Sequence, residues 1–267
     1  MMAKGTNKYG LKRDPGEEIR RQIRQRCGFG CVICGLAFYD YEHFAPDFAD
    51  AKEHNPKGMT LLCAQCNQKR ARGRLSADTV ARANASPKCL QQGFSQEMFD
   101  FGIEPITVKF AGSTFRNCQH LIAVNDLPLL SITPPKYEGQ PVLVSGLFTN
   151  ADGQITLSIK DNEFYIGPES WDVQCVGPLL TFRNGLGDIS LIIRLHTPSG
   201  LSIERLVMKY QGIVLNGTEN NLRYSLDNGI HWGEMKNSLF ESCHAGIVLK
   251  NGPPSANDQV YDPRNLF

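Results

Sequence analysis

The sequence predicts an α+β protein in which a small N-terminal module with two cysteine pairs precedes an all-β, sandwich- or barrel-like domain. Three observations support this prediction. Two Cys-x2-Cys pairs and helix-type periodicity lie in the first hundred residues, and short β-type runs follow one another from about residue 103. The two regions also carry opposite net charge. With 267 residues, the chain is long enough for about two domains with buried cores.

The overall net charge of +1 conceals an asymmetry along the chain. Residues 1–90 contain 16 lysines and arginines against nine aspartates and glutamates, whereas the remainder contains 12 against 18. A basic first third predicts a polyanionic partner, and the acidic remainder predicts a different one. No apolar run approaches the ~18 residues that a membrane span needs, so we expect no membrane partner.

The N-terminal stretch MMAKGTNKYGLKRDPG is polar and lacks the hydrophobic core of a signal peptide. We interpret residues 1–16 as a flexible basic lead. Cysteine occurs nine times, an odd number, and four of the nine lie in metal-type pairs, which favours a reducing compartment over a disulfide framework. These observations predict a cytoplasmic protein.

Helical segments are expected between residues 17 and 102. EEIRRQIRQR (17–26) opens with acidic residues and places Ile19 and Ile23 four apart on one face. Its arginines form either a solvated face or a surface beside a phosphate-handling site. SADTVARANA (76–85) and SQEMFDF (95–101) each begin on a serine cap and predict weaker helices.

Residues 103–250 read as a domain made only of strands. Turn signals such as NADG, TPSG and LDNG separate closely spaced β-type runs, with no helical period between them. The runs are ITVKF, PVLVSGLF, QITLSIKD, EFYIG, LLTFRN, DISLIIRLH, LSIERLVMKY, GIVLNG and LRYSL. Such a series is typical of a sandwich or barrel. The polar, proline-rich segment 251–267 is expected to be a flexible tail.

The two cysteine pairs, CVIC and CAQC, predict a structural zinc site with the ligands Cys31, Cys34, Cys63 and Cys66. Two residues between paired ligands allow a tight turn to bring both sulfurs to one Zn²⁺ ion. Four thiolates close the coordination shell, so this zinc would fold the protein and not catalyse. Cys27 lies near enough in sequence to compete with Cys31.

The segment between the cysteine pairs carries residues suited to catalysis. FYDYEHF (38–44) reads as a strand that ends on Glu42 and His43, and Asn67 directly follows the second cysteine pair. Phosphodiester hydrolysis needs a base for the attacking water and a cation for the developing charge. A neutral histidine suits the first role, and Mg²⁺ or Mn²⁺ on a carboxylate and an amide oxygen suits the second.

These motifs, CVIC, YEHFAP and GMTLLCAQCN with the basic residues that follow, resemble the HNH or ββα-metal nucleases, specifically their four-cysteine subgroup. The resemblance covers about residues 20–80. It implies that His43 is the general base and that Glu42 and Asn67 hold the catalytic divalent ion. It also implies a nuclease of DNA used in phage defence or restriction. Nucleic-acid contacts are expected from Lys69, Arg70, Arg72 and Arg74, which can grip phosphates regardless of sequence.

The chain departs from the family at the middle position of the motif. The usual asparagine, which orients the histidine, lies near where this chain has Gly58. Asn55 is our candidate for this catalytic position, and His54 beside it is the alternative. A third option is that neither residue takes the place of the asparagine.

The cysteines and histidines of CQH (118–120) and CH (243–244) lack ligand-like spacing. They could pair as a second metal site, although buried thiols and satisfied histidines are commoner.

Two further functions compete with the nuclease. One is a non-catalytic zinc DNA-binding protein with a β effector domain, and a plain binding module has no need for Glu42, His43 and Asn67 together. The other is a nuclease toxin held inactive by a partner on its acidic β domain. The β domain is expected to sense a ligand or a protein partner, or to form a homo-oligomer.

Overall fold

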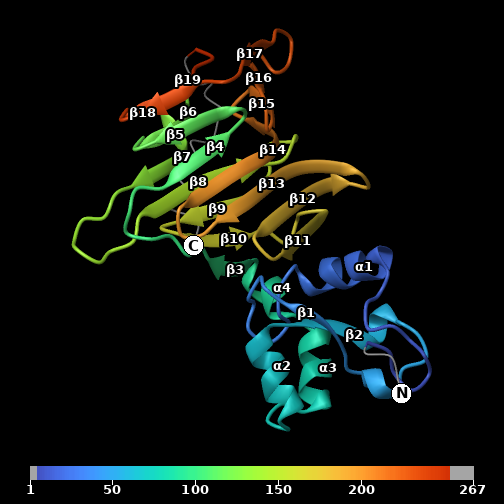
Figure 1. Cartoon of the computed structure of the whole chain (residues 1–267). Helices are drawn as coiled ribbons and strands as arrows, with labels where there is room; N and C mark the ends of the chain where they lie inside the picture. The colour runs from blue at the N-terminus through green and yellow to red at the C-terminus, as the bar shows by residue number, and fades with distance from the viewer. Residues whose placement is uncertain (1–4, 253–267) are drawn as a thin grey trace. The chain divides into compact units, whose positions relative to one another are not determined.

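The computed structural model describes residues 5–252 and shows a mixed, mostly β protein that forms two compact units (Figure 1). The first unit comprises residues 5–97 together with Ile166–Gln174, and the second comprises residues 98–165 and 175–252. The division therefore falls at 97/98, near the expected 102/103. No sequence signal places Ile166–Gln174 with the N-terminal unit. Residues 253–267 of the expected tail and the first four of the expected lead lie outside the described residues.

The first unit contains short helices around a two-stranded hairpin. Its elements are α1 (Glu17–Cys27), β1 (Asp40–His43), β2 (Met59–Leu62), α2 (Ala64–Ala71), α3 (Ala77–Ala85) and α4 (Lys88–Gln92), with single 3-10 turns at Phe48–Asp50 and Pro56–Gly58. The helix predicted over 17–26 is confirmed, and it ends because Gly28 adopts a left-handed conformation with φ +69°. The helix predicted over 76–85 is confirmed as well. The Ser76 hydroxyl caps it by accepting from the backbone N–H of Thr79.

The helix predicted over 95–101 is wrong, because this segment begins with strand β3 (Ser95–Met98). The carbonyl of Gln96 accepts a hydrogen bond from Ala37 N at 2.9 Å, and Leu36 forms a parallel bridge with Gln96. Backbone pairing with a segment about 60 residues away thus overrides the local preference of a short run behind a serine.

The core of the first unit is small and includes three of the predicted zinc ligands, Cys31, Cys63 and Cys66, whereas Cys34 is exposed. Ile23 of α1, Leu61 of β2 and Val80 of α3 are fully buried and pack with Cys31 and Cys66. Residues 5–16, expected as a flexible lead, are attached to this unit. The buried side chain of Asn7 donates to the carbonyls of Phe48 and Ala51 at 2.7 and 2.6 Å.

The second unit is built from strands, and each of the nine predicted runs coincides with one to within a residue or two at either end. The strands from β4 onward are β4 (Thr107–Phe110), β5 (Ser113–Arg116), β6 (His120–Val124), β7 (Leu127–Thr133), β8 (Leu143–Thr149), β9 (Ile155–Lys160), β10 (Glu163–Ile166), β11 (Asp172–Val176), β12 (Leu179–Gly185), β13 (Asp188–His196), β14 (Gly200–Tyr210), β15 (Ile213–Thr218), β16 (Leu222–Ser225), β17 (Gly233–Met235), β18 (Leu239–Glu241) and β19 (Ala245–Leu249). No helix lies between them in the described residues from 98 to 252.

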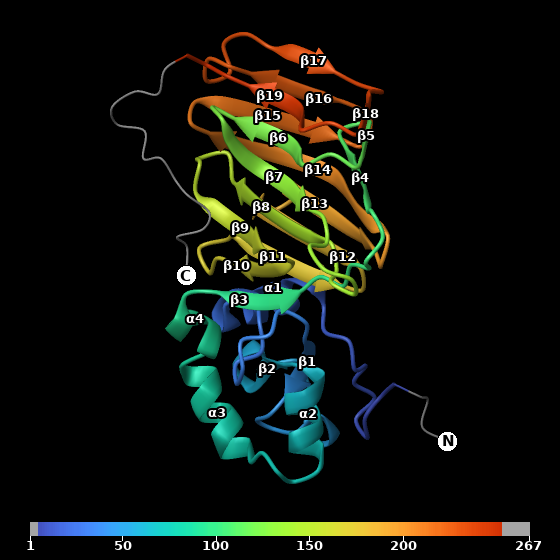
Figure 2. The same ribbon diagram turned by 90° about the vertical axis from the view of Figure 1, so that its left-hand side faces the viewer.

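Two sheets order these strands within the described residues, and they can be followed in Figures 1 and 2. One runs β19-β6-β7-β8-β9-β10, and the other runs β11-β12-β13-β14-β15-β16-β17. In the second sheet β4 also pairs with β14, and β5 pairs with both β4 and β18. Buried and partly exposed positions alternate along much of β14 and β15, so one face of this sheet covers the core.

Candidate metal centre and catalytic cavity

The hairpin of the first unit holds the candidate catalytic residues in a fixed register. Strands β1 and β2 are antiparallel, with Glu42 opposite Thr60 and His43 opposite Met59. All four residues of β2 are buried, which fixes this strand in the core. Cys63 follows β2 directly and caps α2, since its sulfur accepts from the backbone N–H of Cys66 at 3.4 Å.

The four predicted zinc ligands form a single cluster. The sulfurs of Cys31, Cys34, Cys63 and Cys66 all lie within 4.8 Å of one another. Cys34 Sγ is 3.5 Å from Cys63 Sγ and 3.9 Å from Cys66 Sγ. Two thiolates on a tetrahedral zinc with bonds of about 2.3 Å lie roughly 3.8 Å apart, so the cluster can hold a metal such as zinc.

These thiols do not ionise equally. The hydrogen bond with Cys34 lowers the pKa of Cys31 to about 5, whereas burial raises the pKa of Cys66 to about 12. The cluster therefore resists four negative charges unless a cation compensates them. Cys27 does not compete for this site, because its sulfur lies 3.9 Å from the oxygens of Thr60 and Asn84 instead.

Glu42, His43 and Asn67 line one open cavity of about 610 Å³, together with Asp47 and Arg70 among others. The amide of Asn67 donates to Glu42 Oε1 at 2.6 Å, so the strand and the helix meet at this point. Asn67 lies in the first turn of α2, where its backbone N–H donates to the carbonyl of Cys63 at 2.9 Å. The helical turn that carries two metal-cluster cysteines therefore also sets the position of Asn67.

His43 is buried and held by a second histidine. Its side chain is 6% exposed, and its Nε2 lies 3.1 Å from Nδ1 of His54. The ring of Phe48 packs 5.5 Å from the His43 ring, centroid to centroid. Burial lowers the pKa of His43, and the charges of His54 and Arg13 lower it further, against a smaller opposing effect of Asp47. His43 is therefore neutral at neutral pH.

The middle position of the motif differs from the prediction. A side chain at Gly58 cannot fit, because its Cβ would lie 2.0 Å from the carbonyl oxygen of Ala45. The structure brings His54, not Asn55, to His43. The Asn55 side chain instead caps the 3-10 turn by accepting from the backbone N–H of Lys57 at 3.0 Å. Of the two candidates for the middle position, His54 and not Asn55 is therefore the one in contact with His43.

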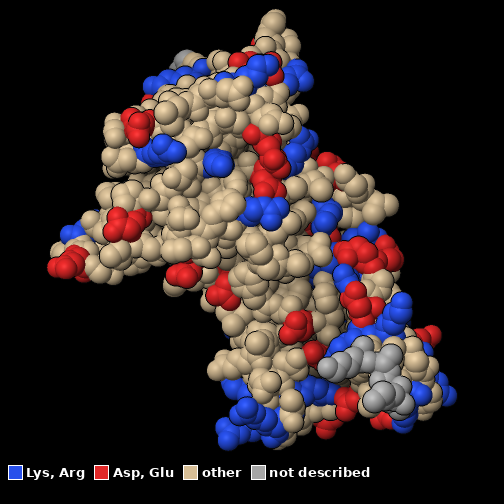
Figure 3. Space-filling view, in the orientation of Figure 1, with Lys and Arg blue, Asp and Glu red and all other residues tan. Residues whose placement is uncertain are grey.

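The four basic residues after the cysteine pair have different surroundings. Arg70 forms an ion pair with Asp47 and donates to the carbonyl of His43 at 3.4 Å. Lys69, Arg72 and Arg74 are exposed. Lysines and arginines gather around the end of α2 and the loop that follows it (Figure 3). Arg70 thus belongs to the cavity wall, and the other three to the outer surface.

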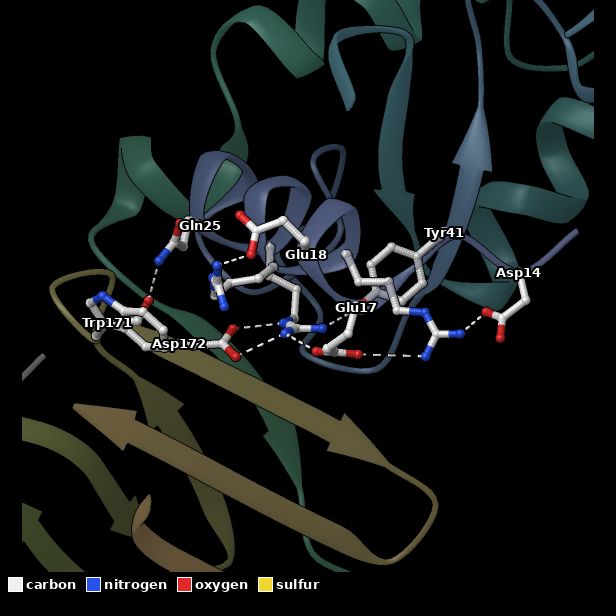
Figure 4. A network of polar contacts seen from close by, with 10 residues as sticks. Asp14, Glu17, Glu18, Gln25, Tyr41, Trp171 and Asp172 are labelled. Atoms are coloured by element: carbon white, nitrogen blue, oxygen red, sulfur yellow. Dashed lines mark hydrogen bonds and ion pairs between the residues drawn. The ribbon is translucent and has the colours of Figure 1, made fainter. Parts of the chain in front are cut away.

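The arginines of α1 are bound within the protein, which resolves the choice between a solvated face and a phosphate-handling surface. Arg24 is fully buried and donates to both carboxylate oxygens of Asp172, at 2.7 and 2.8 Å, and to the hydroxyl of Tyr41 at 2.7 Å (Figure 4). Burial alone would lower the pKa of the Arg24 guanidinium, but its acidic partners, Asp172 first, raise it well above its ordinary value. The Arg21 guanidinium lies 4.9 Å from the Trp171 ring.

Asp172 was not identified from the sequence. It lies about 150 residues from α1 in an ordinary β-type stretch, and no local pattern marks it as the partner of a buried arginine.

The second metal site that CQH (118–120) and CH (243–244) could form is absent from the described residues. In that part of the chain, only Cys31, Cys34, Cys63 and Cys66 bring three or more metal-type ligands close together.

Comparison with family models, curated proteins and solved structures finds no match to this chain. Within residues 5–252, no helix is long and apolar enough to cross a membrane.

Proposed function

We propose that the first unit is a metal-dependent, HNH-type endonuclease that hydrolyses phosphodiester bonds, with DNA as its substrate. The observation that carries this proposal is the convergence of Glu42, His43 and Asn67 on one open cavity beside a four-cysteine metal cluster. A hairpin followed by a helix supplies these three side chains. A purely structural zinc module has no need for a buried neutral histidine and a carboxylate–amide pair in the same cavity.

In this proposal His43 is the general base. The lowered pKa keeps its ring neutral, and contact with His54 fixes the ring through Nε2. This leaves Nδ1 to take a proton from the attacking water. His54 acts as a positioning residue in the place of the usual asparagine.

Glu42 and Asn67 would hold the catalytic divalent ion, Mg²⁺ or Mn²⁺. A carboxylate and an amide carbonyl are the hard oxygen ligands that these ions prefer, and the 2.6 Å contact brings both side chains to one point. Rotation of the Asn67 amide would present its oxygen where its nitrogen now lies. When bound, the ion supplies a Lewis acid for the phosphate oxygens and the leaving group.

Charge and shape favour a nucleic acid as the substrate. The cavity is open and includes Arg13 and Arg70, so a phosphate can reach His43 from solvent. The exposed Lys69, Arg72 and Arg74 extend the positive surface beyond it, which suits a long polyanion more than a small phosphate ester. The second unit, which is acidic in sequence, would sense a ligand or partner or mediate assembly.

The test is the substitution His43→Ala in the zinc-loaded full chain. We expect cleavage of DNA in the presence of Mg²⁺ or Mn²⁺ to fall by ~10²–10⁴, with zinc content and folding unchanged, because His43 lies outside the metal cluster. Asn67→Ala should also reduce cleavage, and higher Mn²⁺ should restore part of it. The matched control is His231→Ala, which removes an exposed histidine of the second unit.

Cleavage by His43→Ala at the wild-type rate would contradict the assignment of the general base, of the divalent-ion ligands and of the reaction. DNA binding that persists in a protein without any cleavage would then support the non-catalytic zinc DNA-binding function. Plasmid DNA, phage DNA with modified bases, and RNA should be compared as substrates. Cleavage of RNA alone would overturn the assignment of DNA.

A further inference from the structure

Two segments far apart in sequence run side by side in the second unit with one constant register. Residues 114–116 of β5 pair in parallel with 239–241 of β18, and 120–124 of β6 pair in parallel with 245–249 of β19. The first pairing belongs to one sheet and the second to the other. The partners differ by the same number of positions in both, so the two segments cross between the sheets together.

This register places Cys118 directly opposite Cys243. Each cysteine follows a residue in the left-handed conformation, Asn117 with φ +49° and Ser242 with φ +51°. Such a conformation is uncommon outside glycine. The amide of Asn117 donates to the Ser242 hydroxyl at 3.2 Å. The two segments therefore change backbone direction at matching positions, just before the two cysteines.

Backbone hydrogen bonds join the two segments on either side of the cysteines. Ser242 N donates to the carbonyl of Arg116 at 3.0 Å, and Gln119 N donates to the carbonyl of Cys243 at 3.1 Å. The facing positions are thereby held before any bond forms between the side chains. This preorganisation removes most of the entropic cost of bringing residues 125 positions apart together.

The sulfurs of Cys118 and Cys243 lie 2.7 Å apart. This separation is shorter than the 3.5 Å between Cys34 and Cys63 in the metal cluster, and shorter than the roughly 3.8 Å of two thiolates on one zinc. It exceeds the ~2.05 Å of a disulfide bond by less than ~1 Å. A small movement of the side chains is therefore enough for a covalent bond.

We propose that Cys118 and Cys243 form a redox site, which a small-molecule disulfide converts from a dithiol to an intrachain disulfide. Cys243 is partly exposed and Cys118 is buried, so the Cys243 thiolate attacks the small disulfide and expels one thiolate, which takes up a proton. The Cys118 thiolate then attacks Cys243 Sγ in the mixed disulfide and expels the second small thiol. One disulfide is reduced to two thiols, and two protein thiols are oxidised to one disulfide.

The surroundings give the small disulfide a place to approach. Both cysteines line a cavity of about 410 Å³, whose other walls include the apolar side chains of Ile103, Ile132 and Val142. A metal at this point fits less well, because Nδ1 of His244 lies 2.6 Å from the side-chain oxygen of Gln119 and no third ligand atom of the described residues joins the two sulfurs. Burial, with the contact to Cys118, raises the pKa of Cys243 to about 11, so the exchange is best measured at mildly alkaline pH.

The experiment treats the zinc-loaded full chain with oxidised glutathione and identifies the linked residues by mass spectrometry of a non-reduced digest. We expect a loss of two free thiols per chain, one peptide linked between Cys118 and Cys243, and full reversal by dithiothreitol. Zinc content should not change. The bond should also raise the thermal midpoint of the second unit by several degrees, because it constrains the unfolded chain.

Cys243→Ser should prevent the loss of both thiols, whereas the matched control Cys175→Ser, which removes another cysteine of the second unit, should leave the cross-link unchanged. Three results would overturn the proposal. They are the absence of the linked peptide in the wild type, linkage of either cysteine to another residue only, and a second bound zinc that Cys243→Ser releases. The wild-type digest decides the question even if a variant fails to fold.

Discussion

The two units differ in what holds their folds together. In the first unit, short helices and a hairpin enclose a core in which Cys31, Cys63, Cys66 and the buried Arg24 lie among the apolar side chains. In the second unit, two long-stranded sheets bury phenylalanine, leucine and isoleucine with few ionisable groups among them. The first unit therefore buries an ion pair and thiols that could hold a metal, whereas the second relies on apolar burial.

This difference suits the two units to different tasks. A site that must present a carboxylate, an imidazole and an amide within one cavity needs side chains held at fixed positions by strong local constraints. A metal on the four-cysteine cluster would provide such a constraint next to Asn67, because Cys63 and Cys66 belong to the same turn. The sheets of the second unit offer a stable surface with no comparable cluster in the described residues.

Metal removal should separate the two units most clearly. We expect Cys66→Ser, or a strong chelator, to unfold the first unit while the second keeps its strand signal in circular dichroism. The reason is that structural zinc in small modules contributes an apparent ~10–16 kcal/mol at neutral pH, more than a small core can replace. Limited proteolysis should then cut within residues 5–97 first. An intact first unit in zinc-free protein would show that apolar burial alone is sufficient there.

Asp172→Asn should produce the next largest effect, again in the first unit. It leaves the buried Arg24 guanidinium without its ionised partner, which typically costs ~3–5 kcal/mol of unfolding free energy. Urea unfolding of the zinc-loaded chain, followed by probes in each unit, measures the loss. The matched control is Glu17→Gln, because Glu17 also pairs with Arg24 but is 54% exposed. A loss of similar size from both substitutions would mean that Asp172 has no special role.

The sequence predicted local features well and distant pairings poorly. Cysteine spacing predicted the four-cysteine cluster because two cysteines two residues apart leave little freedom in placing the sulfurs. Alternating apolar runs identified strands such as β13 and β14 because the period of a strand is local. The division at 97/98 also lies close to the change in sequence texture.

What the sequence did not reveal depends on contacts between remote residues. The partner of Arg24 is Asp172, and the partner of Cys118 is Cys243, each more than 100 positions away. The strand at 95–98 likewise arises from pairing with Leu36, which no local sequence pattern predicts. His54 was one of two adjacent candidates, and only the three-dimensional path of the loop decides between it and Asn55.

The smallest expected effect concerns the binding of nucleic acid by the exposed cations of the first unit. Lys69→Gln, Arg72→Gln and Arg74→Gln should each weaken duplex binding modestly and without regard to sequence. Removing one cation that binds a phosphate should reduce the magnitude of the negative slope of log K against log[salt] by about 0.9. Arg70→Gln should behave differently, because it also frees the Asp47 carboxylate in the cavity and removes a hydrogen bond to the His43 carbonyl. It should therefore reduce cleavage as well as binding.

Binding is best measured in the His43→Ala background, so that the duplex stays intact during the titration. The matched control is Lys250→Gln in the second unit, which removes one exposed cation that pairs with Asp126. Its salt slope should equal that of the parent, because an acidic unit offers no net attraction to a phosphate backbone. If Lys250→Gln lowered the slope as much as Lys69→Gln does, the duplex would contact both units. The assignment of nucleic-acid binding to the first unit alone would then fail, even with the catalytic cavity unchanged.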